Sequence, residues 1–258
     1  MTKKKTESKR LSEWNLLMWL GQATYEEGKY KVAEMKFKKA LNCLEELNIT
    51  DERLASNLNS LALCYCAQGN HKKSDALYQK AIEIDENSVT RDRVALSIDF
   101  NNLATHYRSQ EKYDRAEPLY QKALSYWDEH DVNPEIASVL NNLGILYCQM
   151  GECSVGESFF QKALSMERRI YGKESKEYAQ TAVNLASNLC MQGKCEEAEP
   201  LFEEGTRILG YQIGPRPELA DALEIYLDYL TKSHQSEKAE KVSKSIGKLR
   251  NKKGNPYG

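Results

Sequence analysis

One motif recurs six times along this chain at a nearly constant spacing, and that spacing limits the folds available to it. The six copies read EEGKYKVAEMKFKKA, AQGNHKKSDALYQKA, SQEKYDRAEPLYQKA, QMGECSVGESFFQKA, MQGKCEEAEPLFEEG and KSHQSEKAEKVSKSI. One turn residue stands before the second half of each copy, and successive turn residues lie 41, 42, 40, 42 and 41 positions apart: Gly28, Gly69, Glu111, Gly151, Gly193 and His234. A constant period of this length predicts stacked helical units rather than one globular core.

Each copy predicts a helix, a tight turn and a second helix. In the third copy, one face of the first helix carries Leu103, Ala104 and Tyr107, which is the spacing of a buried stripe. A small residue on the first helix of five copies would let the second helix approach closely: Gly21, Ala62, Ala104, Gly144 and Ala186. An aromatic residue on the second helix would fill the space between units: Phe37, Tyr78, Tyr120, Phe160 and Phe202. The turn glycines are expected to adopt a left-handed conformation at the end of the first helix.

This pattern, together with LNNLGILY and AEPLYQKAL, resembles the tetratricopeptide repeat, and its period resembles the longer repeat of kinesin light chains. The resemblance covers about residues 12–249 and implies an all-α, right-handed superhelical solenoid of six helix hairpins. We expect the repeats at residues 12–47, 53–86, 95–129, 135–170, 177–210 and 218–249. A basic disordered tail is expected over residues 1–11 and a second tail over residues 250–258.

Composition narrows the class of partner and compartment. Basic residues gather at both ends of the chain while the net charge is −2, so the segment between them is acidic. An acidic body disfavours nucleic acid and favours protein or peptide partners. The sequence contains no apolar run of the length of a membrane span. Seven cysteines, an odd number, indicate a reducing compartment, and we expect a cytoplasmic protein.

In the family that this chain resembles, the first helices line the concave face of the solenoid and hold a ligand. The matching positions carry mainly asparagine, and the candidate groove residues are Asn59, Asn101, Asn102, Thr105, Arg108, Asn141, Asn142, Gln149 and Asn184. Asparagine is a poor residue inside a helix, so its repetition needs a reason. Its amide suits the backbone of an extended peptide, and it equally suits a bond to the neighbouring repeat. The sequence leaves both interpretations open.

Arg108 and Asn142 match positions that contact an acidic peptide in kinesin light chains. Few other basic residues occupy the remaining groove positions, where Cys66, Cys148 and Cys190 stand instead. The resemblance therefore implies a peptide groove, but it does not imply a strongly acidic ligand or a role beside a motor protein.

The sequence argues against catalysis and against a zinc site. The four histidines lie in different repeats, with no acid or base partner at an informative spacing, so no catalysis and no cofactor are expected. The pairs Cys148 with Cys153 and Cys190 with Cys195 repeat at equal offsets and suggest zinc. Equivalent helices of a stack lie about 8–10 Å apart, which is too far for four thiolates on one ion. We therefore expect these cysteines to fill a seam between helices, with no metal.

The sequence thus predicts a non-catalytic adaptor or scaffold that holds a peptide or helix of a partner protein in the concave groove. The alternative is a peptide-sensing regulator that acts through a partner protein, because the first repeat begins near residue 12 and we expect no helix-turn-helix domain in this chain. A monomer is favoured over an oligomer, although the end of a solenoid can pair with a second copy.

Overall fold

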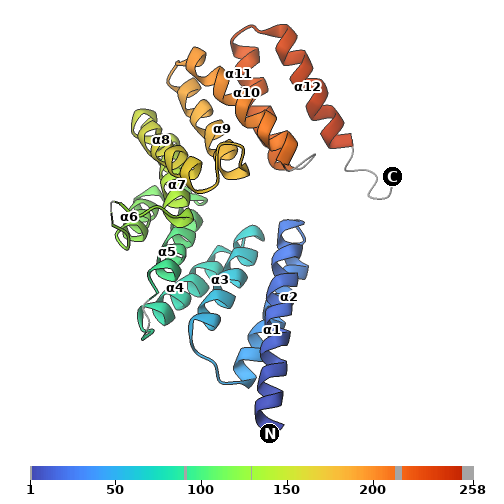
Figure 1. Cartoon of the computed structure of the whole chain (residues 1–258), viewed down its shortest axis with the longest axis vertical. Helices are drawn as coiled ribbons and strands as arrows, with labels where there is room; N and C mark the ends of the chain where they lie inside the picture. Colours follow the sequence, from blue (N-terminus) through green and yellow to red (C-terminus); the bar gives the residue numbers. More distant parts are fainter. Residues whose placement is uncertain (1, 90–91, 129, 213–216, 252–258) are drawn as a thin grey trace. The chain divides into compact units, whose positions relative to one another are not determined.

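The computed structural model describes residues 2–89, 92–128, 130–212 and 217–251 of the chain. Every regular element in these ranges is an α-helix (Figure 1). The helices are α1 Thr2–Glu26, α2 Tyr30–Glu46, α3 Glu52–Ala67, α4 His71–Glu86, α5 Arg93–Arg108, α6 Tyr113–Leu124, α7 Pro134–Gln149, α8 Cys153–Ile170, α9 Lys176–Met191, α10 Cys195–Gln212, α11 Pro217–Lys232 and α12 Ser236–Asn251. Successive helices pair into six hairpins, which confirms the predicted fold class.

The chain divides into two compact units, which we call unit 1 (Met1–Glu129) and unit 2 (His130–Gly258). Unit 1 contains the hairpins α1–α2, α3–α4 and α5–α6, and unit 2 contains α7–α8, α9–α10 and α11–α12. Inside each unit, the second helix of one hairpin packs against the first helix of the next. The first helices of successive hairpins also touch, as α1 with α3, α3 with α5, α7 with α9 and α9 with α11. Each unit is therefore a stack in which neighbours along the chain share an interface.

The turn inside each hairpin has the backbone geometry that the repeat pattern predicts. All six turn residues have a positive φ: 75° at Gly28, 74° at Gly69, 59° at Glu111, 84° at Gly151, 78° at Gly193 and 57° at His234. In the first hairpin, the N–H of Gly28 bonds the carbonyl of Tyr25 at 2.9 Å and the N–H of Lys29 bonds that of Thr24 at 3.0 Å. The same pair of bonds recurs in every hairpin and closes the C-terminus of its first helix.

Two glycines show how closely the helices of a hairpin approach. A Cβ on Gly21 of α1 would lie 2.5 Å from the ring of Phe37 on α2, and a Cβ on Gly144 of α7 would lie 2.6 Å from Phe160 on α8. Both rings are buried. The small residue of the first helix therefore receives the aromatic ring of the second, as the sequence predicted.

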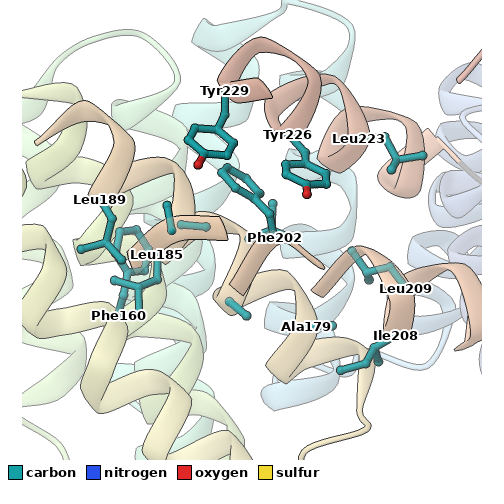
Figure 2. Close-up of a cluster of buried hydrophobic side chains, with 14 of the residues drawn as sticks. Phe160, Ala179, Leu185, Leu189, Phe202, Ile208, Leu209, Leu223, Tyr226 and Tyr229 are labelled. Atoms are coloured by element: carbon teal, nitrogen blue, oxygen red, sulfur yellow. The ribbon is translucent and has the colours of Figure 1, made fainter. Parts of the chain in front are cut away.

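The core of unit 2 is a continuous cluster that joins its hairpins (Figure 2). In it, Phe202 of α10 faces Tyr226 and Tyr229 of α11, with ring centroids 5.1 and 5.7 Å apart. Aromatic pairs at this separation hold successive hairpins together over a large apolar area.

The N-terminal segment differs from the disordered tail expected over residues 1–11, because α1 already begins at Thr2. Neither proline nor glycine interrupts this stretch, and Arg10 forms ion pairs with Glu13 at 2.9 Å and with Glu46 of α2 at 2.6 Å. Helix propensity and these pairs extend the first helix. The single solenoid expected over residues 12–249 stays a prediction, and each of the two units is described by itself. Of the expected C-terminal tail, residues 252–258 lie outside the described residues.

Candidate functional site

A pocket in unit 2 opens on the first helices of three successive hairpins. Its volume is about 170 Å³, and its lining comes from α7, α9 and α11 together with one ring of α8: Ile145, Cys148, Gln149, Phe160, Asn184, Ser187, Met191 and Ile225. Met191 is 61% exposed and Ile225 is 37% exposed, so apolar side chains meet solvent at its rim. Two predicted groove residues, Gln149 and Asn184, contribute amides to the lining, and Ser187 adds a hydroxyl group.

The asparagines of unit 2 bond to each other across the hairpins. Asn141 of α7 accepts hydrogen bonds from Asn184 Nδ2 at 3.0 Å and from Thr181 Oγ1 at 3.3 Å, both on α9. Asn141 therefore joins two neighbouring repeats. Asn184 lines the pocket as well as making this bond, so it serves both interpretations that the sequence left open.

In unit 1, the predicted groove residues divide into a buried one and a half-buried group. Asn59 of α3 is 8% exposed, and its amide donates to the carboxyl group of Asp99 on α5. The half-buried residues Thr105 and Arg108 lie on α5. The hydroxyl group of Tyr120 on α6 lies 2.9 Å from Thr105 Oγ1 and accepts a hydrogen bond from Arg108 Nε at 3.2 Å. Asn59 thus connects repeats, while Tyr120 orients Thr105 and Arg108.

The remaining candidates are half-buried on the first helices, with Asn101 and Asn102 on α5 and Asn142 on α7. Arg108 belongs to unit 1 and Asn142 to unit 2. Their joint contact with one ligand therefore remains a prediction.

Two further asparagines hold the stack and were not identified from the sequence. Asn57 of α3 is fully buried and donates to the backbone carbonyl of Phe37 at 3.1 Å. Asn188 of α9 is also fully buried, and it donates to Cys148 Sγ at 2.9 Å and to the carbonyl of Cys153 at 3.0 Å. All three bonds run to the preceding hairpin. The sequence does carry a signal for both residues. Each asparagine occupies a position on the buried face of its helix, where the repeat pattern predicts an apolar residue.

Buried carboxyl groups form a second feature of the seams between hairpins. Asp85 of α4 and Asp99 of α5 are 4% and 2% exposed, and Glu167 of α8 is 5% exposed. Burial is the largest cause that raises the pKa of Asp99 to about 8; the hydrogen bond from Asn59 opposes the shift and the charge of Asp85 adds to it. Burial also raises the pKa of Glu167 to about 7, against the hydrogen bond that Thr181 Oγ1 donates at 3.0 Å.

The cysteines whose side chains the structure describes are free thiols, and those of unit 2 lie in a helix seam. Burial raises the pKa of Cys148 to about 11, so its thiol is protonated near neutral pH. Its sulfur accepts the Asn188 bond and lies 3.8 Å from Met191 Sδ. These contacts fit the expected packing role. The side chain of Cys195 lies outside the described residues.

No helix in the described part of the chain combines the length and apolarity needed to cross a membrane. A comparison with curated protein sequences finds no match.

Solved structures with the same fold include proteins of several kinds. BtubC (BKLC) from P. vanneervenii is 20% identical over 87% of this chain and 92% of its own, with a TM-score of 0.74. The Rap conjugation gene regulator of plasmid pLS20, solved in complex with the Phr* peptide, is 21% identical over 97% of this chain and 72% of its own, with a TM-score of 0.72. A putative kinesin light chain from Podosopora anserina with nearly identical TPR-like repeats is 15% identical over 80% of this chain and 96% of its own, with a TM-score of 0.58. At these identities the likeness shows the fold alone.

The family profile of the tetratricopeptide repeat matches residues 15–87, 52–129, 94–155 and 135–209. These overlapping matches cover most of the chain. The six hairpins, the left-handed turns and the stacking within each unit agree with them. The chain belongs to the tetratricopeptide repeat family.

Proposed function

We propose that this chain is a non-catalytic interaction protein whose unit 2 holds a segment of a partner protein against α7, α9 and α11. The pocket lined by these three first helices carries the proposal, because it combines exposed apolar side chains with amide groups. Neither an acid, a histidine nor a basic residue lines this pocket among the described residues. Its lining therefore suits recognition of a neutral segment better than acid–base chemistry.

The segment would place one apolar side chain into the pocket. A volume of about 170 Å³ is enough for a single aliphatic or aromatic side chain rather than a whole small-molecule ligand. Gln149 and Asn184 then stand beside the backbone of the segment, where each amide can both donate and accept. An apolar anchor with backbone hydrogen bonds is how an extended peptide or a helix binds a groove.

In unit 1, the same function would use α5. Its half-buried residues Asn101, Asn102, Thr105 and Arg108 lie along one helix, and Tyr120 holds the last two in place. A guanidinium group that is oriented before binding loses less conformational entropy when it contacts a carboxylate or carbonyl group. Asn142 of α7 is half-buried and offers the same amide chemistry within unit 2.

The pocket is tested by selecting peptides from a random library on the wild-type protein and measuring their affinity for two variants. Met191→Asp places a charge at the rim of the pocket, and we expect at least tenfold weaker binding. Val155→Asp is the matched control, because Val155 is an apolar residue of unit 2 that is 38% exposed and lies outside the pocket. Equal binding by both variants would remove the pocket from the proposal.

The half-buried polar residues of α5 and α7 are tested with the triple variant Asn102→Ala, Arg108→Ala and Asn142→Ala. We expect weaker binding of the same peptides, with an unchanged circular dichroism spectrum, because the three side chains are only half-buried. Unchanged affinity would leave these residues with a structural role.

A peptide-sensing regulator is the second candidate function. It is favoured by the similarity to a Rap regulator that was solved with a peptide. The two functions differ in one measurable way. A scaffold binds its partner with the same affinity whether or not a separate peptide is bound. In a regulator, the peptide changes the affinity for the partner, and the partner changes the affinity for the peptide by the same factor. Titrating a selected peptide against a partner protein distinguishes them.

A further inference from the structure

Three side chains with metal-binding chemistry meet in unit 1, where the second hairpin packs against the third. Cys66 is near the end of α3, His71 is the first residue of α4, and His106 is on α5. One ligand atom from each lies within 4.8 Å of the other two. Cys66 Sγ is 3.5 Å from His106 Nδ1, and the rings of His71 and His106 have centroids 5.5 Å apart. The three residues come from three different helices, so the stack itself brings them together.

This donor set suits a transition metal ion. A thiolate and two imidazoles are ligands of Zn²⁺, at about 2.3 Å from sulfur and about 2.0–2.1 Å from nitrogen. Tetrahedral geometry at these lengths separates the ligand atoms by about 3.5 Å, which the Cys66–His106 distance already meets. His71 is exposed at the start of its helix, so its ring can rotate the remaining distance at little cost.

The surroundings of His106 support binding through Nδ1. The imidazole is 2% exposed, and its Nε2 lies 2.9 Å from Gln110 Nε2. An amide nitrogen only donates, so binding through Nδ1 requires the Gln110 amide to turn over and accept the Nε2–H with its oxygen. A hydrogen bond at the far nitrogen fixes the tautomer and orientation of a metal-binding histidine. Nδ1 faces Cys66, and Ser74 Oγ lies 3.4 Å from it. Cys66 is half-buried and His71 is exposed, so water can reach a fourth ligand position.

The equivalent seam of unit 2 shows that packing alone does not require these histidines. Cys66 and His71 lie three residues before and two residues after the turn residue Gly69, and Cys148 and Cys153 have the same offsets from Gly151. His106 lies five residues before the next turn residue, as does Asn188. In unit 2 the amide of Asn188 donates to Cys148 Sγ at 2.9 Å. An N–H donor bonds a thiol but cannot bind a metal, so only the unit 1 seam presents three ligands at these positions.

We propose that Cys66, His71 and His106 bind one divalent transition metal ion, with Zn²⁺ as the best match and a water molecule as the fourth ligand. The ion displaces the thiol proton of Cys66 and joins α3, α4 and α5. This site differs from the cysteine pairs whose spacing first suggested zinc, and no metal was expected from the sequence. The two histidines belong to different repeats, so the local pattern does not reveal the site. Their proximity follows from stacking and not from local spacing.

The test uses tag-free, reduced, full-length protein titrated with Co²⁺, which replaces Zn²⁺ and absorbs visible light. We expect one ion per chain, with a thiolate-to-cobalt charge-transfer band and the d–d bands of tetrahedral coordination. Zn²⁺ should displace the Co²⁺ and abolish these bands. Absence of stoichiometric Co²⁺ binding would overturn the proposal.

Four variants locate the site. Cys66→Ser should abolish the charge-transfer band, and His71→Asn should weaken Co²⁺ binding at least tenfold without affecting the fold, because His71 is exposed. Cys148→Ser removes the corresponding thiol of unit 2, and His130→Asn removes an exposed histidine of unit 2; both should bind as the wild type does. Bands that persist in both Cys66→Ser and His71→Asn, or that disappear in Cys148→Ser, would place the ion elsewhere and contradict the proposal.

Discussion

The second seam of unit 1 and the first seam of unit 2 use the same positions of the repeat for different chemistry. In unit 1, the seam where α3 and α4 meet α5 contains Asp85 with Asp99, and Cys66 with two histidines. In unit 2, the seam where α7 and α8 meet α9 contains Glu167 with Thr181, and Cys148 with Asn188. Asp85 and Glu167 both lie sixteen residues after their turn residue, and Asp99 and Thr181 both lie twelve residues before theirs.

This comparison separates what the repeat determines from what it leaves free. The backbone places a polar pair and a sulfur at fixed points of each seam, because the two seams share the same hairpin geometry. The side chains then decide how the seam responds to its surroundings. The unit 1 seam places ionisable groups beside each other, as Asp85 with Asp99, whereas the unit 2 seam pairs Glu167 with a hydroxyl group and Cys148 with an amide, both of which donate hydrogen bonds.

The largest effect is expected from Asn188→Ala, which removes the permanent bonds of the unit 2 seam. The variant loses the donor to Cys148 Sγ and to the carbonyl of Cys153, and both acceptors remain partly buried. We expect a loss of about 2–3 kcal/mol in the free energy of unfolding. Urea unfolding followed by far-ultraviolet circular dichroism measures it.

The control in unit 1 is His71→Asn at an exposed position of the seam, measured without metal. It should alter stability by less than about 0.5 kcal/mol, because the side chain is exposed. If Asn188→Ala were as mild as His71→Asn, the two seams would not differ in the way proposed.

The second effect concerns pH and the Asp85–Asp99 pair. Asp99 has a pKa of about 8 in the folded protein against an ordinary value of 3.8, so the native state binds this proton more tightly than the unfolded chain. The stability due to this proton is complete below about pH 3.8 and is lost as the pH rises through 8. Asp99→Asn imitates the protonated acid and can still accept the Asn59 bond. We expect the variant to be more stable than the wild type by about 1–3 kcal/mol near pH 9 and similar to it near pH 4.

Tryptophan fluorescence measures this change in unit 1, because the three tryptophans are Trp14, Trp19 and Trp127 and all belong to that unit. Asp114→Asn is the control, since Asp114 is exposed on α6. A pH-independent difference between Asp99→Asn and the wild type would show that Asp99 does not carry the proton.

Glu167→Gln is the same experiment in unit 2, with a smaller expected effect. Burial raises the pKa of Glu167 to about 7 from an ordinary value of 4.5, so its contribution to stability is lost between about pH 4.5 and 7. The shift is smaller than that of Asp99, and Thr181 already donates to the charged form. We expect the variant to gain about 1 kcal/mol near pH 9, less than Asp99→Asn gains. Circular dichroism at several pH values provides the measurement, and the reverse order of the two variants would contradict the comparison.

The fold was predictable because its determinants are local. The turn positions, including Glu111 and His234, follow from the period, and the contact of Gly21 with Phe37 follows from a small and an aromatic residue on facing helices. The start of α1 was missed because the charge of its first residues suggested a tail. An ion pair between Arg10 and Glu46, on the neighbouring helix, is invisible in the local pattern.

The site was only partly predictable because its contacts cross from one repeat to the next. Asn59 and Asn141 were identified as special, but their partners Asp99 and Thr181 lie 40 residues further on, which no helical period shows. The pocket of unit 2 includes Ile225 of α11, which lies one repeat beyond the α9 residues of the same pocket. These contacts join residues about one repeat period apart, so a comparison of equivalent positions in neighbouring repeats would predict them.

The smallest effect tests whether the two units share the same backbone requirement at their turns. Glu111 in unit 1 and His234 in unit 2 have φ values of 59° and 57°, where the other four turns have glycine. A left-handed conformation costs a residue with a Cβ about 1–2 kcal/mol, and glycine avoids this cost. Part of the gain is offset because glycine loses more conformational entropy on folding than other residues. Glu111→Gly and His234→Gly should therefore each stabilise the protein by about 0.5–1 kcal/mol. Glu111→Ala is the control, because it removes the side chain and keeps the Cβ. An equal gain in stability for Glu111→Ala and Glu111→Gly would assign the effect to the loss of the glutamate charge. The backbone argument would then fail for unit 1, while it would still stand for His234.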